Sequence, residues 1–438
     1  MQPLKYLAAA LPVLLAAAAM HFGIRDNPSA AVAAGQAYQR SSPFPSPGSP
    51  RHPEWEKIAE RLSRDLQDRH LPFGTVLDPV FASPRSRRIV GYSRAGDSAI
   101  WTGHYLAAEA FRFAVTGSPE ALRNAHTALE GIRSLVDVTG EDLLARAMIP
   151  VDEPFAARIL REERRHGFSR GVAGDREYHW IGNTSRDQYS GVFFGLAAAW
   201  ELIDDPGARR TSRDLVTRLL DRLLRERWWV VMPNGRIATL FHHRPEQQLA
   251  LLQIGRRVNP ERFTEAYRQK RGAVAGFAAL PLAGDTLDDH RWYFKFNLDS
   301  INLFHLVSLE EPGRYRRLYE WAYEILRRTT DDHPNAHFHL IDRALRGPDA
   351  ARDSETVELL AAWLRRPRRD RYIDLRDEFA ACGDDRACEP LPVERWVRTD
   401  FLWQRSPFLL RGGGHGTIEG AGIDFLLPYW MARYYGIL

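Results

Sequence analysis

Two kinds of helical pattern alternate along the chain after residue 53. The first carries Arg and Glu on one face and apolar residues at helical spacing on the other, which predicts helices half exposed to solvent. The second is apolar nearly all round and rich in Ala, Gly, Leu and aromatic residues, and such a helix must be enclosed by others. The segments of the first kind are 55–69, 119–138, 209–227, 260–279, 313–328 and 352–365. Those of the second kind are 97–115, 186–203, 245–254, 292–307, 335–345 and 419–435.

The two kinds alternate strictly, six of each, and this order predicts an inner ring of helices wrapped by an outer ring. We therefore expect an all-α fold, an (α/α)6 toroid of six inner and six outer helices, built by residues 54–438 as one domain. One clear strand signal interrupts it, because the segments 228–232 and 236–241 flank the turn sequence Pro233-Asn234-Gly235. It predicts a small inserted β-hairpin.

The first residues have the order of a secretory signal. Lys5 precedes an apolar run over 6–20, which is shorter than the roughly 20 residues of a membrane span. We assign residues 1–34 to a signal peptide and the Pro/Ser-rich stretch 35–53 to a linker, and expect a secreted or periplasmic protein with no membrane span after signal removal. Cys382 and Cys388 share one loop, and an exported chain meets an oxidising compartment, so a disulfide is predicted.

Charge narrows the class of partner. Lys and Arg number 60 against 56 Asp and Glu, and the surplus is spread along the chain, so nucleic acid is not the expected partner. The basic residues are nearly all Arg, whose planar guanidinium suits bidentate pairing with carboxylates. An acidic ligand and ordinary surface ion pairs are the two readings of that bias.

The pattern resembles the six-hairpin glycosidase-like superfamily of (α/α)6 barrels over nearly all of 54–438. The segments GDSAIWTG, GNTSRDQYSG and RTDFLWQRSPFLL are similar to those of uncharacterised secreted bacterial proteins. The resemblance is architectural, so it transfers no residue roles. It implies a substrate cleft at the N-terminal ends of the inner helices, where unpaired N–H groups and helix dipoles also favour hydroxyl-rich or anionic ligands. A carbohydrate is accordingly the expected substrate.

Polar residues of this sequence gather at those helix starts. Glycoside hydrolysis needs a carboxylic acid and a carboxylate, and our candidates are Asp187, Asp97, Asp332 and Glu419. Asp at a helix start is also what capping and the helix dipole select, so capping is the competing explanation for these residues. Glu419 follows the run from Gly412 to Gly416, where missing side chains would let backbone approach a ligand, or where the chain is only a flexible connector.

Other residues at the same helix starts are candidates for substrate binding. Aromatic rings among them offer an apolar face with a polar edge to a sugar, although most rings on such helices belong to a core. The set is Arg186, Tyr189, Trp101, Gln188, His290, His333, Asn335, Glu246, His415 and Trp403. His333 and His290 each follow a pair of Asp residues, at 331–332 and 288–289. No metal site or cofactor is indicated.

The leading prediction is an exported glycoside hydrolase, and the superfamily resemblance implies inversion at the anomeric carbon. A polysaccharide lyase or sugar epimerase on the same toroid is the alternative, in which His or Tyr removes a proton beside a uronate carboxylate that Arg neutralises. A third reading, from another class, is a non-catalytic scaffold that binds glycans or envelope partners. It predicts polar residues scattered over both rims.

Overall fold

The computed structural model describes residues 52–288, 293–383, 386–398 and 401–438. The predicted signal peptide, nearly all of the linker and His290 lie outside this part. Within it the chain is 60% helix and 13% strand, so the predicted helical class is confirmed in that coarse sense. Segments with one charged face form α2 (Pro53–Asp65), α4 (Pro119–Asp137), α7 (Pro206–Arg225), α9 (Pro260–Val274), α12 (Arg314–Thr330) and α14 (Ala350–Trp363).

The segments that are apolar all round form a second set, which we call the apolar helices. They are α3 (Ser98–Thr116), α6 (Arg186–Leu202), α8 (Pro245–Val258), α11 (Tyr293–Leu309), α13 (Ala336–Arg346) and α15 (Ile423–Tyr434). Two shorter helices, α5 (Ala156–Glu162) and α10 (Ala279–Asp285), were not predicted as separate elements. On α3 every residue from Ser98 to Arg112 is buried, as an apolar helix requires.

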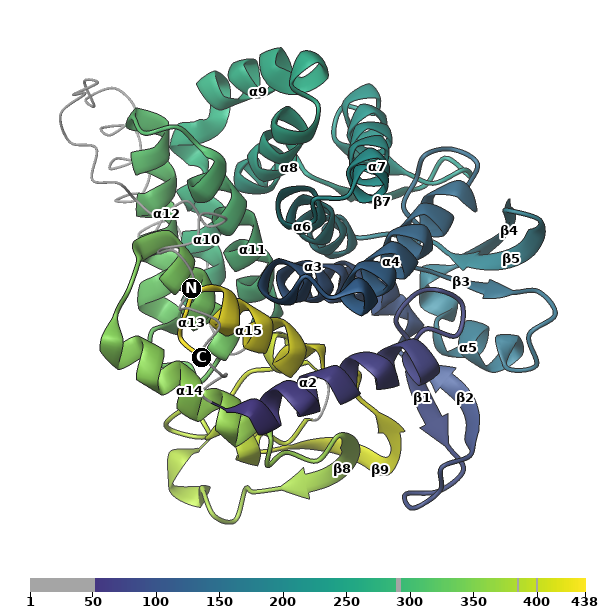
Figure 1. Cartoon of the computed structure of the whole chain (residues 1–438), viewed down its shortest axis with the longest axis vertical. Helices are drawn as coiled ribbons and strands as arrows, with labels where there is room; N and C mark the ends of the chain where they lie inside the picture. Colours follow the sequence, from purple (N-terminus) through teal and green to yellow (C-terminus); the bar gives the residue numbers. More distant parts are fainter. Residues whose placement is uncertain (1–51, 289–292, 384–385, 399–400) are drawn as a thin grey trace.

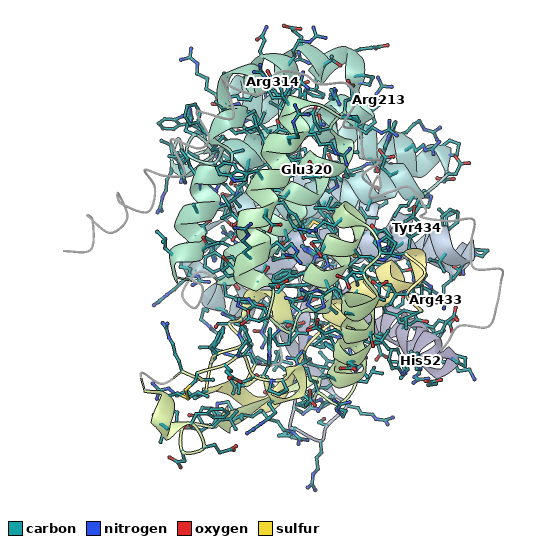
Figure 2. All side chains as sticks on the ribbon, turned by 90° about the vertical axis from the view of Figure 1, so that its left-hand side faces the viewer. His52, Arg213, Arg314, Glu320, Arg433 and Tyr434 are labelled. Atoms are coloured by element: carbon teal, nitrogen blue, oxygen red, sulfur yellow. A yellow bond between two sulfur atoms is a disulfide. The ribbon has the colours of Figure 1, made fainter. Side chains whose placement is uncertain are left out.

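Each apolar helix contacts other apolar helices and at least one charged helix. The pairs α3–α6, α6–α8, α8–α11, α11–α13, α13–α15 and α15–α3 are all in contact, and α11 also touches α6. The charged helices α4, α7, α9, α12, α14 and α2 pack on α3, α6, α8, α11, α13 and α15 respectively (Figure 1). On the last of these pairs Arg433 donates to Glu56 at 3.0 Å, and Figure 2 labels Arg433 and His52 on that side of the molecule. Most of the buried apolar residues form one continuous core between these helices.

The strand content corrects the sequence analysis, which expected a single hairpin. That hairpin is present as β6 (Trp229–Val231) and β7 (Ile237–Leu240), but the described residues form two more antiparallel sheets. One has the order β3-β5-β4, from Ala147–Pro150, Arg176–Ile181 and Phe168–Ala173. The other has the order β2-β1-β9-β8, from Ile89–Ser93, Asp78–Phe81, Arg411–Glu419 and Arg369–Asp374.

The sheets share a position in the chain. The strands β2, β5, β7 and β9 each end a few residues before the start of an apolar helix, namely α3, α6, α8 and α15. Strand segments therefore precede the N-terminal ends of four apolar helices. The hairpin before α8 was predicted, whereas loops were expected before α3, α6 and α15. Sequence patterning missed these other strands because they are short and irregular, and because pairings such as Val80 with Ile418 join segments far apart in the chain.

The glycine run before Glu419 is one of these strands, which corrects the expectation of a flexible connector or a ligand-approach loop. A Cβ at Gly413 would lie 1.9 Å from the carbonyl oxygen of Arg371, and one at Gly414 would lie 2.1 Å from an Asp370 oxygen. These glycines therefore permit close pairing of β9 with β8. Glu419 ends β9, and α15 begins only at Ile423.

Two further expectations meet the structure here. Cys382 and Cys388 form the predicted disulfide, with their Cα atoms 5.2 Å apart. Among the described residues, helices long and apolar enough to cross a membrane were searched for and not found.

Candidate functional site

Asp97 lies at the start of α3 and receives hydrogen bonds on both carboxylate oxygens. Gln188, from the first turn of α6, donates to Oδ1 at 3.2 Å, and Gln404 donates to Oδ2 at 3.1 Å. The side-chain oxygen of Gln188 accepts from the Ile100 N–H at 2.9 Å, which turns its NH2 group toward Asp97. Asp97 occupies the N-cap position but makes no capping bond, so capping does not explain this residue. Two amide donors instead fix the orientation of its carboxylate.

Asp187 lies in the first turn of α6, half-buried, beside the same group. Burial raises the pKa of Asp187, the negative charge of Asp97 raises it further, and the cations of Arg146 and Arg186 oppose both effects. Ser185, at the N-cap position of α6, likewise makes no capping bond and accepts from Arg146 at 2.8 Å instead. The structure therefore brings together Asp97 and Asp187, two of the four predicted catalytic carboxylates, in different environments.

Arg146 connects the starts of α3 and α6. It is buried and donates to the carbonyl oxygens of Gly96 at 2.7 Å and Asn183 at 3.0 Å, and its Nη1 lies 3.8 Å from Asp97 Oδ1. These bonds tie together the two loops that lead into the helices. Because its other N–H groups are used in this way, Arg146 fixes the position of the carboxylates as well as supplying positive charge.

Glu163 and His166 lie against this group, their side chains 3.5 Å apart at Oε2 and Nε2. Burial raises the pKa of Glu163, partly offset by a hydrogen bond from the Gly96 backbone. Burial, Arg146 and Arg165 lower the pKa of His166 to about 4, so its imidazole is neutral at ordinary pH. We call Asp97, Asp187, Gln188, Gln404, Arg146, Glu163 and His166 the α3–α6 site.

Sequence reasoning found only part of this site. Arg146, Glu163, His166 and Gln404 lie between the predicted helices. Only Gln404 falls in a segment singled out above, RTDFLWQRSPFLL, and that segment gave it no role. Tertiary structure alone brings them to Asp97, and the one local signal was the density of polar residues around 183–188.

Arg186 and Glu246 belong to a neighbouring buried network. Arg186 donates to the Leu240 carbonyl oxygen at 2.9 Å, and burial followed by the charge of Arg244 lowers its pKa. Arg244 binds three carboxylates, with contacts of 2.6 Å to Glu246, 2.5 Å to Asp285 and 2.6 Å to Asp299. The three carboxylates come from α8, α10 and α11, and together they balance the charge of the buried Arg244 guanidinium. The network anchors the start of α8 beside the α3–α6 site.

Asp332 and Glu419 lie apart from Asp97 and Asp187 in their contacts. Asp332 is 73% exposed at its side chain, and its contact is with the neighbouring His333 at 3.8 Å. Glu419 pairs with Arg69 at 2.9 Å, Arg369 at 3.3 Å and Arg368 at 3.6 Å, which joins β9 to the end of α2. These ion pairs give Glu419 a structural explanation.

The other predicted binding residues have varied surroundings. Asn335 caps α13 by accepting from the His337 N–H at 3.1 Å, and His333 is buried with its ring 5.3 Å from that of Tyr293. His415 is exposed on β9. His290 lies outside the described residues.

The aromatic candidates are buried. Trp101, Tyr189 and Trp403 are 3%, 0% and 1% exposed, so their rings lie in the core and form no platform on the surface. Trp101 stacks on Phe401 with centroids 3.7 Å apart, and Tyr189 packs edge-on against Phe241. The expectation of surface stacking platforms at these three positions is therefore not carried further.

A surface hollow of about 520 Å³ lies at the opposite ends of the same helices. It is lined by Phe113 to Gly117 of α3 and its C-cap, by Glu201 and Leu202 of α6, and by Tyr434 of α15. The carboxylates of the α3–α6 site are not among its lining residues. In the part of the chain that is described, His, Cys, Asp and Glu form no group of three or more suited to a metal ion.

Comparison with known proteins gives no further guidance, because no protein-family model, curated protein or solved structure matches this chain.

Proposed function

We propose that the apolar helices form the inner ring of an (α/α)6 toroid and that the chain is an exported glycoside hydrolase acting at the α3–α6 site. The ring is supported by the contacts that run through all six apolar helices and return to α3, with at least one charged helix on each. Export is supported by the N-terminal sequence, and the disulfide is compatible with it. The substrate is an oligo- or polysaccharide.

One observation carries the catalytic assignment: two neighbouring carboxyl groups have opposite environments. Asp97 accepts one hydrogen bond from an amide on each carboxylate oxygen. Asp187 is half-buried beside Asp97, and burial followed by the charge of Asp97 raises the pKa of Asp187. A carboxyl group whose pKa is raised suits the role of general acid, and a neighbouring carboxylate oriented by two amides suits the role of base.

In the proposed reaction Asp187 donates its proton to the glycosidic oxygen while the bond from that oxygen to the anomeric carbon breaks. A water molecule attacks the anomeric carbon from the opposite face and gives its proton to Asp97. One water is consumed, the free hydroxyl leaves with the proton of Asp187, and the configuration inverts. Gln188 and Gln404 are positioning residues that orient the carboxylate of Asp97.

A lyase or epimerase is the second candidate, and His166 is the observation that favours it. A neutral imidazole beside Arg146 and Asp97 is in the protonation state of a general base. Such an enzyme would remove a proton from the carbon next to a uronate carboxylate. The concentration of carboxylates and amides at the starts of α3 and α6 supports an enzyme over a non-catalytic scaffold, whose polar residues would be scattered.

The test incubates the mature protein with a panel of neutral and uronate glycans and scores new reducing ends and unsaturated products separately. Reducing ends without unsaturation, with the inverted anomer seen first by NMR, are the expected result. Asp187→Asn and Asp97→Asn should each lower kcat at least about a hundredfold. Asp349→Asn is the matched control, because Asp349 only caps α14 and Asn caps equally well. If the wild type forms unsaturated products and His166→Ala does not, the reaction is elimination and not hydrolysis. Full activity in Asp187→Asn would exclude Asp187 as the general acid.

A further inference from the structure

Four buried polar side chains meet next to the α3–α6 site. His104 comes from α3, Asn297 from α11, His337 from α13 and Trp403 from the 3-10 turn Leu402–Gln404, and each is at most 1% exposed. The ring of Trp403 lies 5.2 Å from that of His104 and 4.4 Å from that of His337, and the two imidazoles are 6.1 Å apart. We call these four residues the axial cluster.

The hydrogen-bonding capacity of the axial cluster is largely unused. His104 Nδ1 lies 2.8 Å from the Ile100 carbonyl oxygen and donates to it, so His104 Nε2 accepts from the Asn297 amide at 3.2 Å. Asn297 Oδ1, both ring nitrogens of His337 and Trp403 Nε1 are buried and have no hydrogen-bond partner among the residues that the structure describes. Buried polar atoms in native proteins nearly always have partners, so several unpaired ones at one place point to a bound molecule.

The chemistry of the axial cluster matches hydroxyl groups. Burial lowers the pKa of His104 to about 4, and burial followed by the proximity of His104 lowers that of His337, so both imidazoles are neutral. The unpaired atoms comprise the indole donor, the amide acceptor and an imidazole that offers one of each. A hydroxyl both donates and accepts, whereas a carboxylate or an ammonium would find no opposite charge among these four side chains.

The surroundings are aromatic. The ring centroid of His104 lies 5.2 Å from that of Trp101, on the same helix, and 5.4 Å from that of Phe194, on α6. Aromatic walls with a few neutral hydrogen-bonding groups are what a sugar ring requires, since its C–H faces are apolar and its edges polar. Trp403 directly precedes Gln404, whose amide donates to Asp97. The single turn Leu402–Gln404 therefore contributes to both the axial cluster and the α3–α6 site.

We propose that the axial cluster binds the hydroxyl groups of a neutral sugar residue, in the place that the Trp403 indole covers in this structure. The location beside the cleaved bond rests on the proposed function, whereas the binding itself does not. Entry requires the indole of Trp403 to move aside. The sugar residue bound at this position is uncharged and is not a uronate.

The experiment uses the mature chain carrying Asp187→Asn, so that binding is measured without turnover. Titration calorimetry compares neutral mono- and disaccharides with glucuronate. Asn297→Leu and His337→Phe remove hydrogen-bonding groups, and each should weaken the neutral sugar about tenfold. Asn302→Leu is the matched control on the same helix, because the Asn302 amide already donates to Ser190 and Leu298, and it should leave the affinity unchanged.

Unchanged affinity in Asn297→Leu and His337→Phe, or tighter binding of glucuronate, would overturn the inference. If either variant fails to fold by circular dichroism, Trp403→Phe gives a second readout, because it should reduce the change in tryptophan emission on sugar binding and leave only the part that comes from Trp101. An undiminished change without Trp403 also overturns the inference. Sugar binding that depends on the axial cluster in a protein without hydrolytic activity would retain this inference and reject the proposed hydrolysis.

Discussion

A Cβ atom added at Gly103 would lie 2.0 Å from the carbonyl oxygen of Gly191, across the contact between α3 and α6. A Cβ at Gly195 would lie 2.2 Å from the Gly103 carbonyl oxygen in the same contact. The backbones of the two helices therefore touch where both lack side chains. This contact sets how closely Asp97 and Asp187, at the starts of these helices, approach each other.

Gly103→Ala should destabilise the protein by about 1–3 kcal/mol or more, because the neighbouring atoms are backbone and move only with the helix. Urea unfolding measures the loss. Gly272→Ala is the control: Gly272 lies on α9 with open space at its Cβ position, and Ala there should be neutral or stabilising by up to about 1 kcal/mol. Equal stability of the two variants would contradict the close helix contact.

Arg112→Met should cost about 3–5 kcal/mol. Arg112 is buried on α3 and donates to Glu109 at 3.2 Å and to Glu120 at 3.0 Å. Its removal leaves the fully buried Glu109 without a cation, and burial already raises the pKa of Glu109. The exposed pair Arg268 and Glu265 provides the comparison, since Arg268→Met should change stability by less than about 1 kcal/mol. A similar loss in both would show that burial of the pair is not the cause.

Asp187→Asn should raise the stability of the protein at neutral pH while it removes activity. Because the pKa of Asp187 is raised in the folded state, its favourable contribution is present below the unfolded pKa of about 3.9 and is lost as pH rises through the folded pKa. The amide of the Asp187→Asn variant does not titrate, so the variant loses no stability in this pH range. The Tm of the variant should therefore exceed that of the wild type increasingly from about pH 4 upward.

Asp205→Asn is the control for this pH dependence, with the opposite sign. The Ala208 N–H, 2.8 Å from Asp205 Oδ1, lowers the pKa of that carboxyl, so its contribution is present above the unfolded pKa and is lost as pH falls. Its variant should gain nothing at neutral pH. Parallel Tm profiles for Asp187→Asn and the wild type would reject the raised pKa.

Replacing both Cys382 and Cys388 by Ser should lower the free energy of unfolding by about 2 kcal/mol, because the disulfide closes only a short loop in the unfolded chain. Urea unfolding of the variant and of the reduced wild type should agree. A thiol assay on the native protein should detect reactive thiol only after reduction. Thiol that reacts at once would contradict the disulfide.

The helices were predictable because their signal is local. A helix that is apolar all round, such as α3 or α6, can only be buried, and the end of each is marked within a few residues by caps, Pro or Gly. The strands were not predictable in the same way. The Gly-rich β9 has no apolar alternation and only two β-branched residues, Thr417 and Ile418, and it is a strand because β8 and β1 lie beside it.

The residues of the candidate site likewise fall into those that local sequence could identify and those that it could not. Asp97, Asp187 and Gln188 were identifiable as polar residues at the starts of apolar helices. The sequence did not show which of the four carboxyl groups are neighbours, because Asp332 and Glu419 occur in equally suggestive segments. Contacts with residues from distant segments distinguish them: Gln404 for Asp97, and a set of arginines for Glu419.

The sequence by itself determined which stretches become helices, which of those are enclosed, and that Cys382 and Cys388 pair, because spacing of apolar residues and proximity in a loop are properties of neighbouring positions. Only the tertiary structure decided the sheets, the meeting of Arg146, His166 and Gln404 with Asp97, and the burial of Trp101 and Trp403. Those depend on how segments that are far apart in the sequence, by as much as 307 residues for Asp97 and Gln404, pack together. Burial and the charge of a neighbour then set the protonation of Asp187, a property that no single segment of the chain contains.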